Sequence, residues 1–329
     1  MKSKVIAVLI FCALLLCVPL ISFLPQKGGG SFNSPKVDTP KNMGEFKILN
    51  QSTGQVETVS ERDFVIGAVA SEMPASFHTE ALKAQAVASH TYAVYQRQLH
   101  RETPDSQLKG ADFAADPENY QVYITEEVAR NRFGQNFDSY WKKITEAVDS
   151  VLGQVITYDG SPIVAAYHAM SSGNTEDCKN IWSGNGLPYL VPVESPGDLL
   201  APDYEAKVSF SADEVSQKLK IRAPDLQLPE DPGAWFSLGE RTASGTLLGV
   251  TVGGSTFTGV QLRSALGLRS ANFTVSFADG QFSFVTKGYG HGVGMSQYGA
   301  DYFARQGQSY DAILAHYYKE TTLTTIKSK

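Results

Sequence analysis

Cysteine is scarce in this chain of 329 residues, and so are motifs that hold metals. Of three cysteines, Cys12 and Cys17 lie in an apolar run near the N-terminus, which leaves Cys178 alone in the rest. This excludes an intrachain disulfide framework and a cysteine-based zinc cage there. No H-E-x-x-H motif occurs, and His168 and Cys178 lack a third ligand nearby. We therefore predict no metal and no other cofactor.

Basic residues are not in excess either. The chain has 28 Lys and Arg against 34 Asp and Glu, a formal net charge of −6. A nucleic-acid-binding surface needs clustered Lys and Arg, so we expect no nucleic-acid partner. With 42% hydrophobic and 19% charged residues, the chain is neither a polytopic membrane protein nor a disordered one.

One long uncharged stretch is present. Residues 5–24 follow Lys2 and Lys4, and at about 1.5 Å per residue they span roughly the 30 Å of a bilayer core. Because no clean A-x-A site follows, we favour an uncleaved transmembrane anchor behind a cytoplasmic tail, residues 1–4, over a cleaved signal peptide. Residues 25–44 hold three Pro and four Gly without a hydrophobic period, which indicates a flexible linker.

Residues 45–329 mix helices and strands without regular alternation, which predicts a single large α+β domain, helical mainly in its first half and β-rich in its last third. Ser60 and Asp63 resemble a capping box that begins a helix, and Pro74 forces its end. Predicted helices cover residues 61–71, 79–99, 213–221, 296–305 and 309–318, and the segment 133–148 is predicted to be helical towards its end. Predicted strands cover residues 46–49, 56–59, 155–158, 163–169, 248–252, 273–277 and 282–285, with 155–158 and 163–169 forming a hairpin.

Glu72 is the carboxylate with the most suggestive position. It lies one turn after Ala68 and two after Phe64, so it shares their apolar helix face. Pro74 would leave the carboxyl at a helix end, near a cleft. Apolar surroundings raise a Glu pKa above its usual value of about 4.3, as a general acid for glycosidic cleavage requires. The spacing alone equally fits an ordinary surface glutamate that closes a helix.

A polar run follows an apolar strand at residues 167–175, Y-H-A-M-S-S-G-N-T. Ends of strands that lead into polar loops are common positions for binding sites, and His168 could donate a hydrogen bond to a substrate. His168 and Ser171 could also suggest a nucleophile pair, but no G-x-S-x-G elbow surrounds the serine. A half-buried structural histidine and a polar turn would give the same pattern.

Residues 288–299 form the densest signal, with five glycines in twelve residues. Glycine permits backbone shapes and close approaches that no other residue allows. The run matches neither a phosphate-binding P-loop nor a dinucleotide fingerprint. It either presents His291, Gln297 and Tyr298 to a polar ligand or forms a structural turn.

Six segments together resemble the family of stage II sporulation protein D (SpoIID), in the family's order and over nearly the whole chain after the linker. They are F-V-I-G-A-V-A-S-E-M-P-A-S-F at 64–77, E-A-L-K-A-Q-A-V-A at 80–88, Q-V-Y at 121–123, H-A-M-S-S-G-N-T at 168–175, L-R-S-A-L-G-L-R-S at 262–270 and H-G-V-G-M-S-Q-Y-G-A at 291–300. Amidase-enhancer proteins share this domain, so the branch of the family stays open.

The resemblance implies a peptidoglycan lytic transglycosylase, anchored in the cell membrane by a single pass with its catalytic domain outside the cytoplasm, between the mother-cell and forespore membranes during engulfment. Its catalytic acid would be the glutamate of the E-M-P motif, Glu72. The expected partners are a SpoIIP-type amidase, which strips stem peptides from the glycan, and a SpoIIM-type membrane protein. The residues expected to bind the sugars are Gln121, Tyr123, His168, Ser171, Tyr204, His291, Gln297 and Tyr298.

Some relatives carry a cysteine pair around the segment of His168 and bind zinc. This chain has Ser171, Ser172 and Asn174 there, so we predict no zinc. Two rival functions remain. One is a non-catalytic glycan-binding module that activates an amidase, and the other is a muramidase that uses water, with Asp63 or Glu80 as the helper carboxylate.

Overall fold

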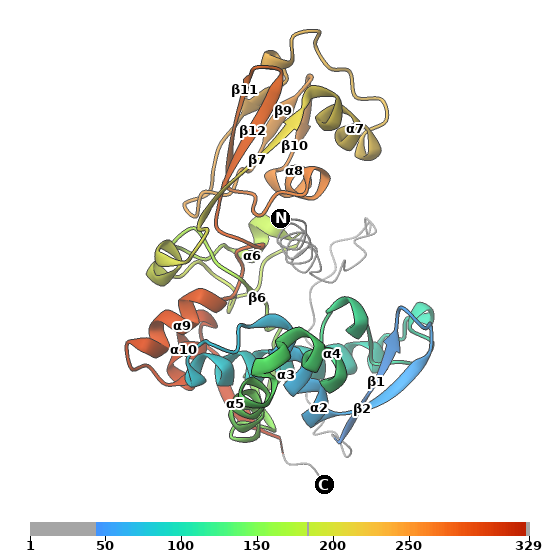
Figure 1. Cartoon of the computed structure of the whole chain (residues 1–329), viewed down its shortest axis with the longest axis vertical. Coiled ribbons are helices and arrows are strands. Elements are labelled where there is room, and N and C mark those ends of the chain that lie inside the picture. Colours follow the sequence, from blue (N-terminus) through green and yellow to red (C-terminus); the bar gives the residue numbers. More distant parts are fainter. Residues whose placement is uncertain (1–43, 183, 327–329) are drawn as a thin grey trace. The chain divides into compact units, whose positions relative to one another are not determined.

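The computed structural model describes residues 44–182 and 184–326. The predicted tail, membrane anchor and all but the last residue of the linker lie outside this range. Within it, no helix combines the length and hydropathy needed to cross a membrane. The described chain divides into two compact units, one built from both ends of the chain (residues up to 166 and from 303) and one from residues 167–302 (Figure 1). The predicted α+β class is confirmed.

The first unit, unit 1, contains most of the helices. Its elements are β1 (Glu45–Asn50), β2 (Val56–Ser60), α2 (Glu61–Glu72), α3 (Thr79–Glu102), η1 (Ser106–Leu108), β3 (Phe113–Ala115), η2 (Pro117–Asn119), α4 (Glu126–Phe133), η3 (Gly134–Asn136), α5 (Phe137–Asp149), β4 (Gln154–Tyr158), β5 (Ser161–Pro162), α10 (Tyr310–Tyr317) and β14 (Thr322–Thr325). Strand β1 pairs antiparallel with β2 and parallel with β3.

Local signals set the bounds of α2. Ser60 Oγ accepts the Asp63 N–H at 3.0 Å, as an N-cap does. The Asp63 carboxylate accepts from the Ser60 hydroxyl at 2.7 Å, so the reciprocal bond of a capping box is replaced by a bond between the two side chains. The helix ends at Glu72, two residues before Pro74, as predicted.

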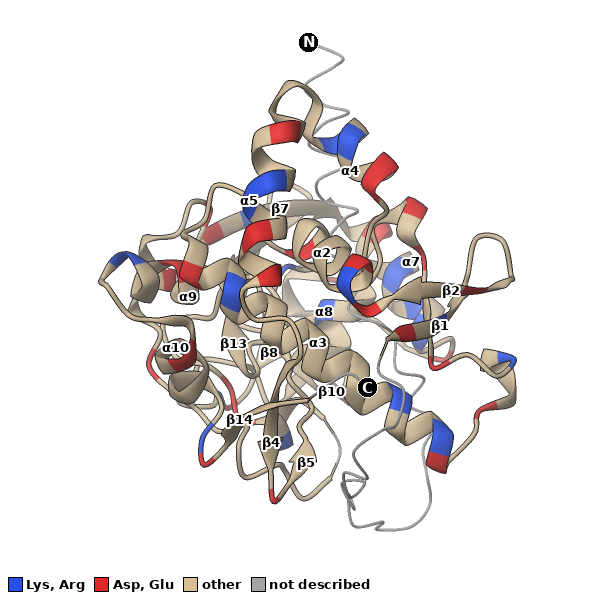
Figure 2. Ribbon diagram, turned by 90° about the horizontal axis from the view of Figure 1, so that it is seen from below, with Lys and Arg blue, Asp and Glu red and all other residues tan. Residues whose placement is uncertain are grey.

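The long helix α3 lies at the centre of unit 1 and packs against α2, α5, α10 and β4. Its charged residues lie near its two ends, and the alanine-rich middle carries none (Figure 2). The alanines are fully buried, because small side chains let neighbouring elements approach the helix closely. Helix α3 therefore holds α2 in place from the side of the core.

The predicted hairpin is wrong in its second strand. Only Ser161–Pro162 pairs with β4, whose other neighbour is β14. A tight turn, in which the Ala166 N–H donates to the Val164 carbonyl at 2.8 Å, interrupts the apolar run. Tyr167–His168 then forms β6, which pairs in parallel with β13 (Met295–Ser296) in the second unit. The apolar residues of 163–166 thus reflect burial, not a strand pairing.

The second unit, unit 2, is β-rich, as predicted for the end of the chain. Its elements are β6, α6 (Cys178–Ile181), η4 (Pro196–Leu200), β7 (Glu205–Ser211), α7 (Ala212–Arg222), η5 (Pro232–Ala234), β8 (Phe236–Leu238), β9 (Val250–Val252), β10 (Ser255–Phe257), α8 (Gly259–Leu266), β11 (Phe273–Ala278), β12 (Gln281–Lys287), β13 and most of α9 (Gln297–Arg305). The sheets β11-β12-β7 and β10-β9-β8 enclose an aromatic core with α7 and α8.

The elements of unit 2 that the sequence analysis missed include β7 and α8. Helix α8 begins with a capping box between Thr258 and Gln261 and is followed by Gly267 in the left-handed conformation, at φ 71°. Both are standard signals for the ends of a helix, so α8 could have been predicted from the sequence.

Candidate functional site

Glu72 is the last residue of α2 and is half-buried. The apolar face that it extends is buried, with Phe64 and Ala68 almost fully covered. Arg132 of α4 reaches the same helix end and donates to the Ser71 carbonyl at 3.0 Å. Burial lowers the pKa of Arg132, while the charges of Tyr120 and Glu72 act in the opposite direction. Glu72 therefore has a cationic neighbour, which the sequence analysis did not foresee.

A strained backbone segment lies against the same helix end. Tyr120 and Val122 have positive φ values of 60° and 75°, which is unusual for any residue with a side chain and most of all for the β-branched valine. The Ser71 hydroxyl donates to the Tyr120 carbonyl at 2.9 Å, and Arg132 lies 5.3 Å from the Tyr120 ring. Such strain, about 1–3 kcal/mol per residue, gathers at functional sites. We call Glu72, Arg132 and residues 120–122 the Glu72 site.

Gly67 explains how this segment comes so close to α2. A Cβ at Gly67 would lie 2.2 Å from the Ile124 carbonyl oxygen, and the Ile124 N–H donates to the Gly67 carbonyl at 3.2 Å. Only glycine permits that approach. Gln121 lies inside the segment and pairs through its backbone with Asp116.

Tyr123 takes a different place from the one expected. It is only 3% exposed, and its ring packs against Phe64 with centroids 5.5 Å apart. Burial raises the pKa of the Tyr123 hydroxyl to about 12. This ring supports the strained segment from inside the core, and in this structure it offers no stacking face to a sugar.

In unit 2, the polar run and the glycine-rich run lie side by side. Beyond the pairing of β6 with β13, Met170 bridges to Tyr289, and the Glu176 N–H donates to the Gly292 carbonyl at 2.7 Å. A Cβ at Gly290 would lie 2.7 Å from the Cβ of His168. The glycine-rich run therefore has a structural purpose, since it lets two backbones approach and brings His168 and His291 together.

The two histidines form a neutral pair, in which His168 is buried and His291 is partly exposed. Their ring centroids are 5.7 Å apart, and His168 Nδ1 lies 3.1 Å from the Val293 carbonyl oxygen. Burial lowers the pKa of His168 to about 4 and that of His291 well below its usual value. His168 Nε2 is buried without a hydrogen-bond partner. Uncharged imidazoles suit hydrogen bonds to a neutral polar ligand.

Asp198 joins the two runs and was missed by the sequence analysis. It is fully buried, and it accepts bonds from the Ser171 hydroxyl at 2.5 Å and from the Ser296 hydroxyl at 2.6 Å. Burial raises the pKa of Asp198, and these hydrogen bonds oppose the rise. Ser171 is thereby engaged in holding the structure together, which argues against its role as a nucleophile.

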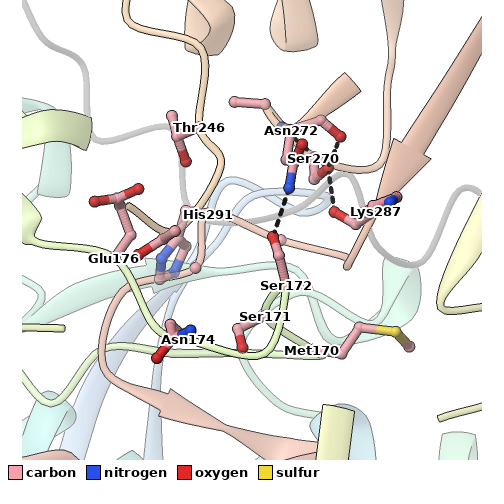
Figure 3. A pocket seen from close by; sticks show the side chains of 14 residues that line it. Met170, Ser171, Ser172, Asn174, Glu176, Thr246, Ser270, Asn272, Lys287 and His291 are labelled. Atoms are coloured by element: carbon pink, nitrogen blue, oxygen red, sulfur yellow. Dashed lines mark hydrogen bonds between the residues drawn. The ribbon is translucent and has the colours of Figure 1, made fainter. Parts of the chain in front are cut away.

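A small polar pocket opens between these segments, with a volume of about 20 Å³ (Figure 3). It accommodates a water molecule or one polar substituent, but not a sugar ring. Its walls include His291, Asn272, which donates to Ser172 Oγ at 3.0 Å, and Glu176, which accepts from Thr242 Oγ1 at 2.6 Å. The Tyr204 hydroxyl, at 3.4 Å, donates to the carbonyl of Ser172.

Gln297 and Tyr298 begin α9 in the same unit. Gln297 is buried, and the Tyr298 N–H donates to the Ala169 carbonyl at 3.1 Å. Unit 2 thus gathers six predicted residues, namely His168, Ser171, Tyr204, His291, Gln297 and Tyr298. Glu72, Gln121 and Tyr123 belong to unit 1.

No group of three or more metal-binding side chains is arranged for an ion among the residues that the structure describes. Cys178 is buried, its Sγ accepts the Leu187 N–H at 3.0 Å, and burial raises the pKa of the thiol. The expectation of no metal stays a prediction.

Buried His168 predicts a pH-dependent stability. An unfolded chain binds protons to histidine below a pKa of about 6.5, whereas folded His168 stays neutral down to about 4. Stability should therefore fall as pH drops through this window, by up to about 1.4 kcal/mol per pH unit for this group. Asp198 acts in the opposite sense, because its raised pKa favours proton uptake by the folded state.

His168→Gln should weaken this dependence, because Gln does not titrate. Urea unfolding of both proteins at pH 7 and pH 5 measures the effect. Equal loss of stability in the variant and the parent would show that His168 is not the responsible group.

Comparisons with known proteins relate this chain to one family. The family model of SpoIID, described as stage II sporulation protein, matches residues 49–158, which include Glu72 and the strained segment. Stage II sporulation protein D of Bacillus subtilis (strain 168) is 34% identical over 98% of this chain and 96% of its own length. That of Bacillus amyloliquefaciens is 35% identical over 100% and 97%. The amidase enhancer of Bacillus subtilis (strain 168) is 28% identical over 79% of this chain and 40% of its own length.

Proposed function

Because the chain belongs to the SpoIID family of sporulation proteins, we propose that it is a lytic transglycosylase that cleaves the glycan strands of peptidoglycan. The observation that carries this proposal is the Glu72 site. A half-buried carboxylate at a helix end lies beside a partly desolvated guanidinium and a strained backbone segment. Burial disfavours the carboxylate form of Glu72 and the guanidinium favours it, and these opposing effects suit a carboxyl group that first gives and then takes a proton.

In the proposed reaction, the Glu72 carboxyl protonates the glycosidic oxygen as the bond to C1 of N-acetylmuramic acid breaks. The resulting carboxylate then takes the proton of the sugar's own C6 hydroxyl, whose oxygen bonds to C1 and closes a 1,6-anhydro ring. No water is consumed, and Glu72 ends in its starting state. Arg132 stabilises the carboxylate between the two steps and holds the last turn of α2 through the Ser71 carbonyl.

The positions of the other candidate carboxylates disfavour a muramidase. Two-carboxylate glycosidases need their carboxyl groups about 5–10 Å apart. Asp63 lies nine residues before Glu72 on the same helix, roughly 14 Å along its axis. Burial raises the pKa of Glu80, but bonds from Lys83 at 2.7 Å and from the Tyr310 N–H at 2.9 Å outweigh it, and the pKa is lowered. Glu80 is therefore committed to the structure.

Unit 2 supplies the groups that we propose for sugar binding. His291 is neutral and lines the small pocket, neutral His168 is buried beside it, and Tyr204 and Tyr298 are partly exposed. Uncharged imidazoles and phenols match the hydroxyl and acetamido groups of a glycan. The small pocket beside His291 would hold one such substituent.

The cellular setting is also part of the proposal. Residues 5–24 would anchor the chain in the cell membrane with its folded part outside, between the mother-cell and forespore membranes. A SpoIIP-type amidase would prepare the glycan by removing its stem peptides, and a SpoIIM-type membrane protein would complete the assembly. Similarity to an amidase enhancer supports an alternative, in which the chain binds glycan and activates an amidase without cleaving the strand itself.

Incubation of the full chain with glycan separates these two functions. We expect new chain ends on amidase-treated glycan without further amidase, and fewer ends on peptide-bearing strands, because stem peptides add bulk and acidic groups that a chain of net charge −6 disfavours. Counting chain ends gives the result. If the chain only accelerates an added amidase and makes no ends alone, the alternative function is correct.

A further inference from the structure

A second concave surface lies on unit 1, where α4 and α5 meet the start of α2. We call it the α4–α5 groove, and its volume is about 510 Å³, within the range of ligand sites. It is lined by Phe137, Trp141 and Thr145 of α5, by Arg130 of α4 and by charged side chains around them. The groove is large enough for sugar rings, unlike the small pocket of unit 2.

An aromatic surface is fixed in this groove. The Arg130 guanidinium lies 3.9 Å from the Phe137 ring centroid, and the Trp141 ring stacks on Phe137 at 5.6 Å with 20° between the planes. Phe137 is buried, whereas Trp141 is partly exposed. The indole is therefore held at a set angle, and an ordered aromatic face with a polar tip suits the apolar face and polar rim of a sugar ring.

The charges of the groove balance. Three basic and three acidic side chains line it: Arg62, Arg130, Lys142, Glu126, Asp138 and Glu146. Several are already paired, such as Arg130 with Glu126 at 2.9 Å. A nucleic acid or an anionic lipid surface would need an excess of basic residues. Balanced polar side chains instead suit a neutral ligand rich in hydroxyl and amide groups.

Thr145 also lines the groove. Its Oγ1 is buried and has no hydrogen-bond partner, although buried hydroxyls normally have one. A protein partner is less well matched, because Lys, Glu and Asp are depleted at protein interfaces and four such residues line this groove. The exposed large hydrophobic residues of the described chain, Val56, Leu152, Leu199, Leu200, Ile221 and Leu248, all lie outside the groove.

The groove is separate from the Glu72 site. Arg132 reaches the end of α2, whereas Arg130 lines the groove. Residues two positions apart on a helix lie about 160° apart around its axis, so these two side chains leave α4 on nearly opposite sides. Helix α4 thus stands between the two sites, with residues of both charge signs along it (Figure 2). A ligand in the groove would leave Glu72 accessible.

We propose that the α4–α5 groove is a second glycan-binding site, which stacks an N-acetylated sugar on Trp141 and retains the protein on the polymer while Glu72 acts on another part of it. The identity of the ligand rests on the proposed function, whereas the binding itself can be tested without cleavage. A Glu72→Gln background serves this purpose, because bound glycan is then not degraded.

The experiment is sedimentation of the full chain with insoluble amidase-treated glycan. Trp141→Ala should weaken binding about tenfold, Thr145→Val several-fold, and Trp141→Phe should retain most of the binding. Tyr140→Ala is the matched control, since Tyr140 is the neighbouring aromatic residue of α5 and lies outside the groove, against Phe133. Thermal unfolding of each variant verifies the fold.

Unchanged binding of both Trp141→Ala and Thr145→Val would overturn the inference. The inference would also be overturned if these variants bound glycan normally but no longer bound a purified amidase, because the groove would then be a protein-docking site. Loss of glycan binding by Trp141→Ala in a chain whose wild type makes no new ends would uphold the groove and refute the proposed catalysis. Cleavage by the wild type, together with unaffected glycan binding by Trp141→Ala, would uphold the proposed catalysis and refute the groove.

Discussion

Glu72→Gln should abolish most cleavage of amidase-treated glycan, with a loss at or beyond the upper end of about 10²–10⁴-fold. Glutamine keeps the shape and much of the hydrogen bonding of glutamate, but it cannot donate or accept the catalytic proton. One side chain serves as acid and then as base, so both steps fail together. The fold should barely change, because Glu72 closes α2 at a half-buried position. The rate of formation of new chain ends measures the effect.

Glu80→Gln and Asp63→Asn are the matched controls, each a carboxylate changed to its amide in the same unit. Both carboxylates accept structural hydrogen bonds, Glu80 from the Tyr310 N–H and Asp63 from the Ser60 hydroxyl. Their amides should reduce stability slightly and activity far less than Glu72→Gln. Near-normal cleavage by Glu72→Gln, together with its loss in Glu80→Gln, would transfer the catalytic role to Glu80.

Glu61→Ala should destabilise the protein by about 3–5 kcal/mol, the usual effect of leaving one buried charge without its partner. Arg97 is fully buried, and its Nη1 donates to Glu61 Oε1 at 2.9 Å. His90 Nε2 lies 3.2 Å from the other carboxylate oxygen. Arg97 also packs over the Phe46 ring, 4.6 Å from its centroid, so its guanidinium is held in the core beside an apolar face. Urea unfolding gives the change in stability.

The exposed pair of Arg62 and Asp149 provides the control. Its two hydrogen bonds are short, at 2.7 and 2.9 Å, yet both side chains are nearly half exposed. Asp149→Ala should therefore change stability by only about 0–1 kcal/mol. Equal effects of the two substitutions would mean that the Glu61 network does not hold the start of α2 against β1 and α3.

Local signals allowed the sequence to predict the frame of the Glu72 site. Ser60 and Pro74 bound α2 within a few residues, and the 3.6-residue period placed Glu72 on its apolar face. Contacts distant in sequence were not predictable in this way. The pairing of β6 with β13 joins residues more than a hundred positions apart, and it removed the expected second strand of the hairpin.

The same limit applies to individual side chains. Arg132 reaches Ser71 only because α4 packs against α2, and nothing in its own sequence window indicates this contact. Asp198 lies in a stretch rich in Pro and Gly that predicts a loop, yet it is the buried acceptor that joins Ser171 to Ser296. Tyr123 belongs to a motif that suggested binding of a sugar. It is a core residue, because Gly67 allows the segment of Tyr123 to pack closely against α2.

The mass of the new chain ends tests the central claim most directly. After digestion of amidase-treated glycan by the full chain, we predict N-acetylmuramic acid ends in the 1,6-anhydro form, lighter by one water than hydrolysed ends, and none of them with Glu72→Gln. Ends that carry the added water throughout would contradict intramolecular attack by the C6 hydroxyl and would show that the enzyme is a hydrolase.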